Sequence, residues 1–371
     1  MFSIKKFFHR QQSTGAPVDR WLTAIILALS CFGVLMVYDS SVAIAIRDFG
    51  DQYYYAKEQL KWLGLGVVAM IILSRIDYRL WKRFALPALI VTMGLLVAVF
   101  IPGLGIRALG AHRWLNFGLF VLQPAELTKL VLVLYLAVWF SVREKERFGA
   151  FLLLSSIIFG LVILEPDLGT GIVIVSTALI MYFLSGAAIR HFALLAPILI
   201  IGVTLLAVTS PYRFRRLTSF LDPNSDPLGA SYQIRQVLLS LGSGGLTGVG
   251  IGKSRQKYEY LPEANTDSIF AIIGEETGFI GASLVVLAYT LFVWRIFWIA
   301  SGTTDPFGKL FTYGIGAWVG VQSTLNIAAM TALLPLTGIP LPFLSYGGSS
   351  LVILLAASGI VLNISRHRQT S

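Results

Sequence analysis

The sequence is poor in charge and nearly devoid of cysteine. Charged residues make up 13% of its 371 residues and hydrophobic residues 56%, whereas soluble domains contain about 25% charged residues. This composition excludes an ordinary soluble protein and predicts a polytopic membrane protein. The single cysteine, Cys31, excludes an intrachain disulfide. The four histidines are scattered, and the sequence contains no P-loop, no GxSxG motif, no zinc-ligand spacing and no internal repeat.

Long apolar runs make up much of the remaining chain. A helix needs about 20 apolar residues to cross a bilayer core, and ten segments meet this requirement. They are residues 21–44, 59–75, 84–101, 123–141, 149–165, 169–186, 192–210, 268–294, 308–330 and 347–364. The sequence therefore predicts an all-α polytopic membrane protein with ten transmembrane helices. The first run is too long for the apolar region of a signal peptide, so we expect an uncleaved helix.

The basic residues between these runs predict the orientation. An even number of helices places both termini on one side, where four basic clusters also fall, and the positive-inside rule makes that side the cytoplasm. The clusters are Lys5/Lys6/Arg10/Arg20, Arg75/Arg79/Lys82/Arg83, Arg143/Lys145/Arg147 and Arg366/Arg368. Residues 1–20 and 365–371 are then cytoplasmic tails, residues 21–364 form the transmembrane domain, and residues 211–267 form a long extracytoplasmic loop between helices 7 and 8.

The long loop is also basic, and the positive-inside rule does not govern long loops. Its basic residues include Arg213, Arg215, Arg216, Arg235, Lys253, Arg255 and Lys257. An anionic ligand such as a phosphate explains this charge, and contact with anionic lipid headgroups is the alternative. Residues 230–241 have the spacing of an amphipathic helix on the membrane surface. The glycines of residues 242–252 either supply amides to an anion or form a turn between membrane elements.

Acidic residues are few and stand in unusual places. Asp267 lies at the seam between the long loop and an apolar run, and Glu275 and Glu276 lie inside that run. Carboxylates are costly in a membrane, so each is a candidate functional residue. Lys129 lies one turn into an apolar helix. We expect it to pair with Glu126, at helical spacing, or with Glu275 or Glu276.

Two segments interrupt the helices with turn residues. Residues 165–171, Glu-Pro-Asp-Leu-Gly-Thr-Gly, predict a tight turn followed by a capped helix. Residues 335–350 contain three prolines close to membrane depth. Irregular backbone is tolerated there only where protein buries it or a water-filled cavity meets it. We expect this second segment beside the polar site, with an ordinary interfacial turn as the alternative.

Five motifs, in this order along the chain, resemble the SEDS (shape, elongation, division and sporulation) family of peptidoglycan glycosyltransferases. They are Gly110–Leu115, Gln123–Lys129, Gly242–Gln256, Leu261–Gly281 and Pro335–Ser350. Residues 252–257, 273–276 and 359–365 are more similar to the division branch, FtsW, than to the elongation branch, RodA. The family usually has His-Thr-Asp-Phe where this chain has Asn265-Thr266-Asp267-Ser268. A role of that histidine therefore does not carry over, whereas the acid is kept.

The resemblance implies a ten-helix glycosyltransferase that polymerises lipid II, with Asp267 as the catalytic residue. The reaction needs a base for the acceptor hydroxyl and positive charge for the leaving diphosphate, and Asp267 is the expected base. The candidates for binding substrate are Arg113, Arg213, Arg216, Lys253, Arg255 and Gln256. A divalent cation, Mg²⁺ or Mn²⁺, is expected to assist them, and Asp267 is its candidate ligand.

The resemblance also implies partners. A class B penicillin-binding protein transpeptidase and other division proteins are expected, and no nucleic acid, because the basic residues sit in short clusters between apolar runs. Two other functions stay open. A lipid II flippase would use Lys129, Glu275 and Glu276 along a polar path, although these residues gather toward the outer half of the membrane. A non-catalytic scaffold would leave Asp267 without a purpose.

Overall fold

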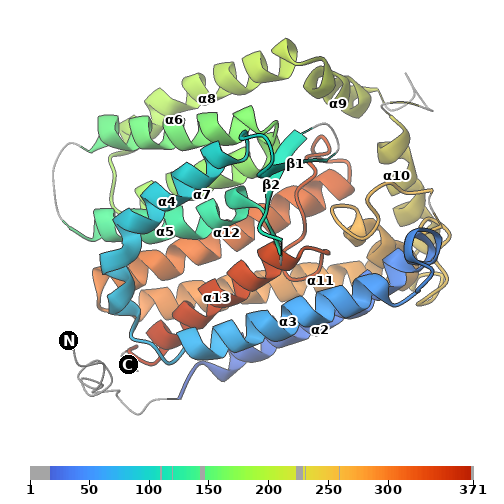
Figure 1. The fold of residues 1–371 in the computed structure, drawn as a ribbon, viewed down its shortest axis with the longest axis horizontal. Helices are drawn as coiled ribbons and strands as arrows, with labels where there is room; N and C mark the ends of the chain where they lie inside the picture. Colours follow the sequence, from blue (N-terminus) through green and yellow to red (C-terminus); the bar gives the residue numbers. More distant parts are fainter. Residues whose placement is uncertain are drawn as a thin grey trace.

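The computed structural model describes residues 17–108, 111–118, 120–142, 147–222, 229, 231–258 and 260–368. Several residues of the predicted basic clusters and motifs lie outside the described residues, namely Lys5, Lys6, Arg10, Gly110, Arg143 and Lys145. The described part is largely helical (Figure 1).

A helix overlaps each of the ten apolar segments. These helices are α2 (Arg20–Phe49), α3 (Tyr54–Leu73), α4 (Ala85–Ala98) with the preceding 3-10 helix η1 (Tyr78–Phe84), α5 (Pro124–Ser141), α6 (Phe148–Leu164), α7 (Leu168–Leu184), α8 (Ile189–Thr209), α11 (Ile269–Ser301), α12 (Pro306–Met330) and α13 (Gly348–Ser365). Within the described residues, five helices are long and apolar enough to cross a membrane, namely Arg20–Phe49, Tyr78–Ala98, Pro124–Ser141, Ile269–Ser301 and Gly348–Ser365. The prediction of a helical membrane protein is therefore confirmed.

Polar caps fix where several of these helices begin. Asp19 caps α2 by accepting a hydrogen bond from the amide of Leu22 at 2.8 Å, and Asp305 caps α12 in the same way through Gly308 at 2.9 Å. Asp167 caps α7, as the turn at residues 165–171 predicted, and it accepts bonds from both the amide and the hydroxyl of Thr170. Each cap satisfies an amide that the first helical turn leaves without a partner.

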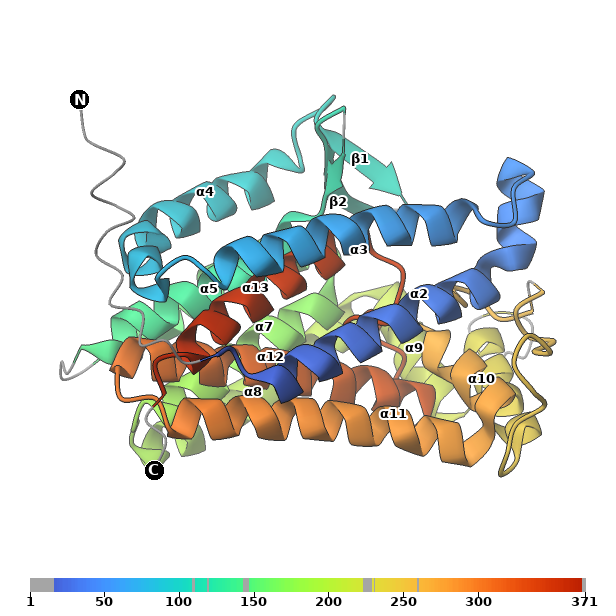
Figure 2. The same ribbon diagram turned by 90° about the horizontal axis from the view of Figure 1, so that it is seen from below.

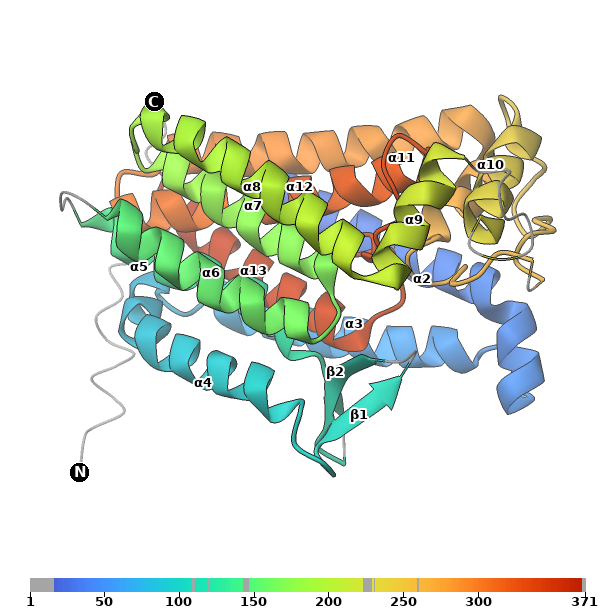
Figure 3. The ribbon, with the colours of Figure 1, turned by 90° about the horizontal axis from the view of Figure 1, so that it is seen from above.

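Helix α12 lies at the centre of the bundle and contacts α5, α7 and α11 (Figure 1). Helices α2 and α3 run side by side, and α3 packs along α13 (Figures 2 and 3). The start of α2 and the end of α13 meet, because the amide of Asp19 donates to the Ser365 hydroxyl at 3.1 Å. Helices α9 (Pro211–Leu221) and α10 (Tyr232–Gly244) lie at the opposite end of the molecule.

The sequence did not predict two elements outside the bundle, a small β-sheet and helix α9. Residues 102–122, expected as a loop, contain an antiparallel sheet of three short strands, β1 (Gly105–Ala108), β2 (Ala111–Asn116) and β3 (Val121–Leu122), in the order β1-β2-β3. The fold is therefore not purely α-helical. Helix α9 was also unforeseen. Helix α10 was predicted, but it packs against α11, where Gly244 and Gly274 come into close contact, in addition to exposing Leu238 and Leu239.

The glycine-rich segment after α10 stabilises a break in α11. Gly278 has φ 66° and ψ −166°, so the long helix is interrupted there. The segment supplies partners for the interrupted backbone: Phe279 donates to the Gly245 carbonyl, and Val249 donates to that of Glu275, at 2.9 and 3.0 Å. A Cβ on Gly248 would lie 2.0 Å from the Glu276 carbonyl. Close backbone approach therefore explains these glycines without an external anion.

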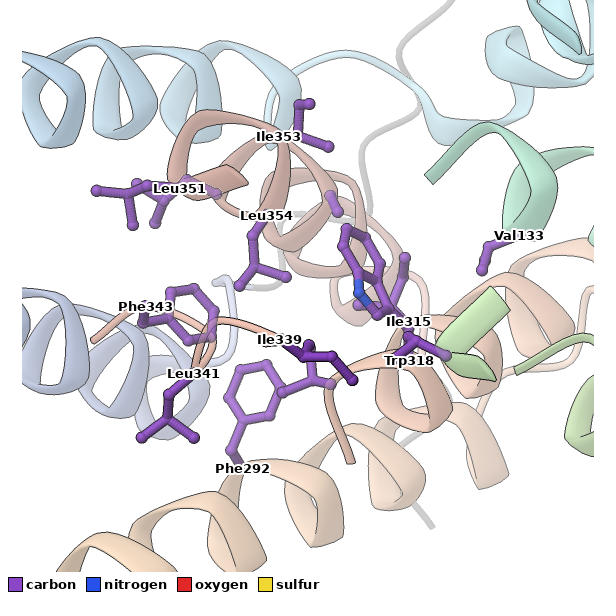
Figure 4. Packing of buried hydrophobic residues seen from close by; sticks show 14 of the residues in the cluster. Val133, Phe292, Ile315, Trp318, Ile339, Leu341, Phe343, Leu351, Ile353 and Leu354 are labelled. Carbon is purple, nitrogen blue, oxygen red and sulfur yellow. The ribbon is translucent and has the colours of Figure 1, made fainter. Parts of the chain in front are cut away.

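The segment before α13 is anchored in the hydrophobic core. Ile339, Leu341 and Phe343 are buried, and Figure 4 shows them in the same packed cluster as Phe292 and Trp318. The rings of Phe343 and Phe292 meet edge to face at 5.5 Å. Protein buries this irregular backbone, as we expected for the proline-rich segment, so its polar residues are held in fixed positions.

Candidate active site

A cavity of about 910 Å³ opens between α3, β2, α9, the segment before α11 and the segment before α13. Its charged lining residues are Glu58, Arg113, Asp167, Arg213, Arg216, Glu263 and Asp267. The cavity therefore brings together four of the residues that the sequence singled out, Arg113, Arg213, Arg216 and Asp267. They come from three separate parts of the chain.

Asp267 lies two residues before α11 and is only 6% exposed, yet it lines the cavity. Its Oδ1 atom accepts no hydrogen bond from the described residues. Its backbone is fixed by α12: Asn326 Nδ2 donates to the carbonyls of both Asp267 and Ile339, at 2.8 Å each. The carboxylate is thus held in place by its main chain while one oxygen stays available to a ligand.

The surroundings of Asp267 raise the pKa of its carboxyl group well above the ordinary value. Burial, followed by the nearby carboxylate of Glu263, raises the pKa of Asp267 to about 7, and the guanidinium of Arg216 partly opposes them. A general base is most effective when its pKa lies close to the working pH. Asp267 therefore combines position, an available oxygen and a suitable pKa.

Backbone carbonyls hold the three arginines of the cavity, and the partner of Arg213 Nη1 is the Leu206 carbonyl at 3.5 Å. Arg113 Nε donates to the Glu165 carbonyl at 3.1 Å, and its second nitrogen donates to that of Pro166. Arg216 Nη1 donates to the Leu336 carbonyl at 2.9 Å. Carbonyl partners orient a guanidinium without neutralising its charge. The side chains keep positive charge at the cavity wall.

Gly338 separates Arg216 from Asp267. A Cβ at this position would lie 3.6 Å from Arg216 Nη1 and 3.8 Å from Asp267 Oδ2, and the residue has φ +69°. The left-handed conformation favours glycine, whereas a Cβ would make only ordinary van der Waals contact with these groups. The positive charge and the carboxylate therefore approach the same small volume.

Beneath Arg113, the turn between α6 and α7 contains a second buried acid. Glu165 is 0% exposed, and neither of its carboxylate oxygens has a hydrogen-bond partner among the described residues. Burial and the neighbouring Asp167 raise the pKa of Glu165 to about 8, with Arg113 acting in the opposite direction. Glu165 is not among the cavity-lining residues. The sequence of residues 165–171 favoured a structural turn and gave no sign of this buried acid.

Lys253, Arg255 and Gln256 are not among the described residues that line the cavity. Their segment is instead bound to the acids of α11. The amide of Arg255 donates to Glu275 Oε1 at 3.1 Å, and the amide of Ser254 donates to Glu276 Oε1 at 3.0 Å. The anions that these amides hold are the chain's own carboxylates. The side chains of Lys253 and Arg255 are exposed.

Glu276 also belongs to a buried ion cluster with Lys257 and Asp39. Lys257 Nζ lies 2.7 Å from Asp39 Oδ1 and 3.1 Å from Glu276 Oε1. Burial alone lowers the pKa of Lys257, but the hydrogen bonds to both acids raise it above its usual value. The cluster joins α2, α11 and the loop between α10 and α11. Asp39 gave no signal in the sequence beyond being an acid inside an apolar run.

Lys129 pairs with Glu126, one of the three acids considered for it. The two side chains are buried, and Lys129 Nζ lies 2.7 Å from Glu126 Oε1 and 2.7 Å from Gln322 Oε1. Gln322 Nε2 in turn donates to the Pro340 carbonyl at 2.8 Å. The pair on α5 is thereby connected through α12 to a residue of the cavity wall. Gln322 and Asn326 stand one helical turn apart, and sequence reasoning missed both.

Comparison with known proteins agrees with the family resemblance that the sequence motifs indicated. Residues 20–370 match the family described as "Cell cycle protein", which comprises FtsW, RodA and SpoVE. The chain belongs to this family. It is 43% identical to the stage V sporulation protein E of Bacillus subtilis (strain 168), over 94% of this chain and 97% of that protein. It is 37% identical to the probable peptidoglycan glycosyltransferase FtsW of Geobacter sp. (strain M18), over 94% and 96%.

Solved structures of the FtsW, RodA and SpoVE family share the fold. A chain of the complex described in "Structural coordination of polymerization and crosslinking by a peptidoglycan synthase complex" matches with a TM-score of 0.78 and 28% identity, over 95% of this chain and 99% of that one. The rod shape determining protein RodA of Thermus thermophilus matches with a TM-score of 0.70 and 27% identity, over 95% and 98%. The similarity in fold therefore extends over 95% of this chain.

Proposed function

We propose that this chain is a peptidoglycan glycosyltransferase that polymerises lipid II into glycan strands during cell division, with Asp267 as the base. The proposal rests on the cavity, in which buried Asp267 faces three arginines and its Oδ1 has no hydrogen-bond partner among the described residues. Relatives at 37 to 40% identity are named probable peptidoglycan glycosyltransferases FtsW, which supports the same activity. Stage V sporulation protein E, a relative at 43% identity, belongs to the same family.

The geometry supplies what the reaction requires. The 4-hydroxyl of the acceptor sugar gives its proton to the Asp267 carboxylate while its oxygen forms a bond to the anomeric carbon of the donor. The bond from that carbon to the lipid diphosphate breaks, and its electron pair leaves with the diphosphate. General-base assistance of this kind contributes about 10²–10⁴-fold to the rate. Arg113, Arg213 and Arg216 stabilise the departing negative charge.

We propose ten membrane spans with both termini in the cytoplasm and the cavity at the outer face of the cytoplasmic membrane. In this topology residues 211–267, with α9 and α10, form the extracytoplasmic catalytic loop. Support comes from the helix that overlaps each apolar segment and from the meeting of the start of α2 with the end of α13. Helix α9, which carries the cavity residues Arg213 and Arg216, lies away from those ends (Figure 1), as an outward-facing site requires.

We also propose a class B penicillin-binding protein transpeptidase as the partner, with other division proteins. A structurally similar chain belongs to a peptidoglycan synthase complex in which polymerisation and crosslinking are coordinated. A transpeptidase that acts beside the cavity would receive the new strand directly.

The described residues do not fit a resident metal ion, since they contain no set of three or more His, Cys, Asp or Glu side chains grouped to hold one. Mg²⁺ often binds through one or two carboxylates and the phosphates of a substrate. A divalent cation that arrives with the diphosphate would find Asp267 Oδ1 as its protein ligand. The steps above use only the residues of the chain.

The experiment is lipid II polymerisation by purified protein, comparing wild type with Asp267→Asn. We expect glycan strands from the wild type and a rate reduced by about 10²–10⁴-fold in the variant. A variant that polymerises at the wild-type rate would remove Asp267 from the role of base. A wild-type protein that moves lipid II across vesicles but makes no strands would indicate a flippase.

A further inference from the structure

One wall of the cavity is aromatic and rich in hydroxyl groups, and the proposed chemistry does not use it. Its residues come from α3 and from the start of α13, and they are Tyr54, Glu58, Trp62, Tyr346, Ser349 and Ser350. All are half-buried. Two of the arginines come from α9, which lies on the other side of the bundle from α3 (Figures 1 and 3). The cavity therefore has a cationic side and an aromatic side.

The aromatic side is held rigidly. A Cβ on Gly348 would lie 2.5 Å from the indole of Trp62, so this ring rests directly on the backbone where α13 begins. Buried Gln59 donates to the Ser345 carbonyl at 3.2 Å and accepts from the amide of Gly347 at 3.4 Å. These contacts fix the wall before any ligand enters, which lowers the entropic cost of binding.

The aromatic side is also bonded to the segment that carries Asp267. The amide of Tyr346 donates to the Asn265 carbonyl at 2.8 Å, and the Ser345 hydroxyl donates to the Thr266 carbonyl. The Tyr346 ring is itself fixed edge to face against Tyr55 at 5.1 Å. A ligand placed on this wall therefore lies next to the carboxylate.

The chemistry of the wall suits an uncharged ring with many hydroxyl groups. Aromatic faces bury apolar C–H surface, while the serine hydroxyls and the Glu58 carboxylate bond to hydroxyl groups. We propose that this wall, centred on Trp62 and Tyr346, binds a sugar ring of the acceptor and directs its hydroxyl to Asp267. The diphosphate of the donor then occupies the arginine side. This inference rests on the proposed function, and it assigns the two sides of one cavity to two substrates.

The test separates the two sides with two probes that bind to the full-length protein in detergent. One probe is a soluble tetrasaccharide of β-1,4-linked N-acetylhexosamine, without lipid or phosphate; the other is undecaprenyl diphosphate. We expect Trp62→Leu to weaken tetrasaccharide binding by about tenfold, in the range of a lost stacking contact. Its affinity for undecaprenyl diphosphate should stay within about twofold. Arg216→Gln should show the opposite pattern.

Two further variants keep the test decisive if Trp62→Leu folds poorly. Gly348→Ala displaces the indole without removing it and should weaken tetrasaccharide binding in the same direction. Trp294→Leu is the matched control, because Trp294 is 58% exposed on α11 and is not among the described residues that line the cavity. It should leave both affinities unchanged.

Each outcome bears on one of the two proposals. The inference is overturned if Trp62→Leu and Gly348→Ala bind the tetrasaccharide as the wild type does. It is also overturned if a wild-type protein that polymerises lipid II binds no tetrasaccharide. If Asp267→Asn polymerises normally while Trp62→Leu loses the sugar, the base assignment fails and the sugar wall stands.

Discussion

Asp267 and the pair Glu275 and Glu276 lie within ten residues of one another and have opposite surroundings. Asp267 borders an open cavity, and its Oδ1 accepts no hydrogen bond from the described residues. Both oxygens of Glu275 accept bonds from the loop, and Glu276 Oε1 accepts from Ser254 and Lys257. All three are acids beside a basic, glycine-rich loop in the sequence. Only the structure shows that two of them fasten the loop, whereas Asp267 is the one of the three that lines the cavity.

The largest expected effect concerns the buried ion cluster of Lys257, Asp39 and Glu276. Lys257→Met leaves Asp39 and Glu276 buried without their cation, which typically costs about 3–5 kcal/mol. Thermal unfolding of the purified protein measures this loss. Lys57→Met is the control, because Lys57 forms a bond of the same length, 2.7 Å, to Asp51 on the surface. An exposed pair contributes only about 0–1 kcal/mol, and equal losses in both variants would contradict the distinction.

Asp267→Asn should stabilise the protein above neutral pH. The pKa of Asp267 is about 7 in the folded protein against 3.8 ordinarily. The folded state therefore binds more protons between these values, and stability falls as the pH rises through that window. A difference of about three pKa units corresponds to roughly 4 kcal/mol, fully present above pH 7. Melting temperatures at pH 5 and pH 8 should diverge between wild type and variant. If the melting temperatures of wild type and variant change by the same amount between pH 5 and pH 8, the folded protein does not bury an ionised Asp267.

Neutralising a cavity arginine should impair the use of lipid II without unfolding the protein. We expect Arg216→Gln to raise the apparent KM or lower kcat by about tenfold, in the range of a lost charge-assisted hydrogen bond. Arg216→Lys should restore part of the activity, because lysine lacks the planar fork of arginine. Arg215→Gln is the matched control on the same helix, since Arg215 is exposed. Equal effects of Arg215→Gln and Arg216→Gln would show that these arginines act only through their general positive charge and not by direct contact with the substrate.

The smallest effect is expected at Lys253 and Arg255. Their side chains are exposed and are not among the described residues that line the cavity. The loop is fixed by backbone amides, which a side-chain substitution retains. Lys253→Gln and Arg255→Gln should therefore keep the polymerisation rate within about twofold at 0.15 M salt, where exposed charges are largely screened beyond about 8 Å. A tenfold loss of rate in either variant would show that the side chains of this loop do bind the substrate.

Much of the bundle could be predicted because the information is local. Apolar runs, the capping residue Asp167, and the spacing of Glu126 and Lys129 each act over a few residues. The missed features depend on contacts between distant parts of the chain. The glycines near Gly248 match a break at Gly278, and Asn326 reaches Asp267 from another helix. Neither contact has a signature in a single sequence. The β1–β3 sheet escaped for a different reason, since its strands have four, six and two residues and are too short to show a clear alternating pattern.

The pH dependence of lipid II polymerisation tests the central claim most directly. If buried Asp267 is the base, the initial rate at low substrate should rise with pH to a plateau, with an apparent pKa near 7. Glu263→Gln removes a carboxylate that raises this pKa, so the midpoint should move to lower pH while the plateau is kept. A rate that stays constant between pH 5.5 and 8.5, or a midpoint that Glu263→Gln leaves in place, would contradict the assignment.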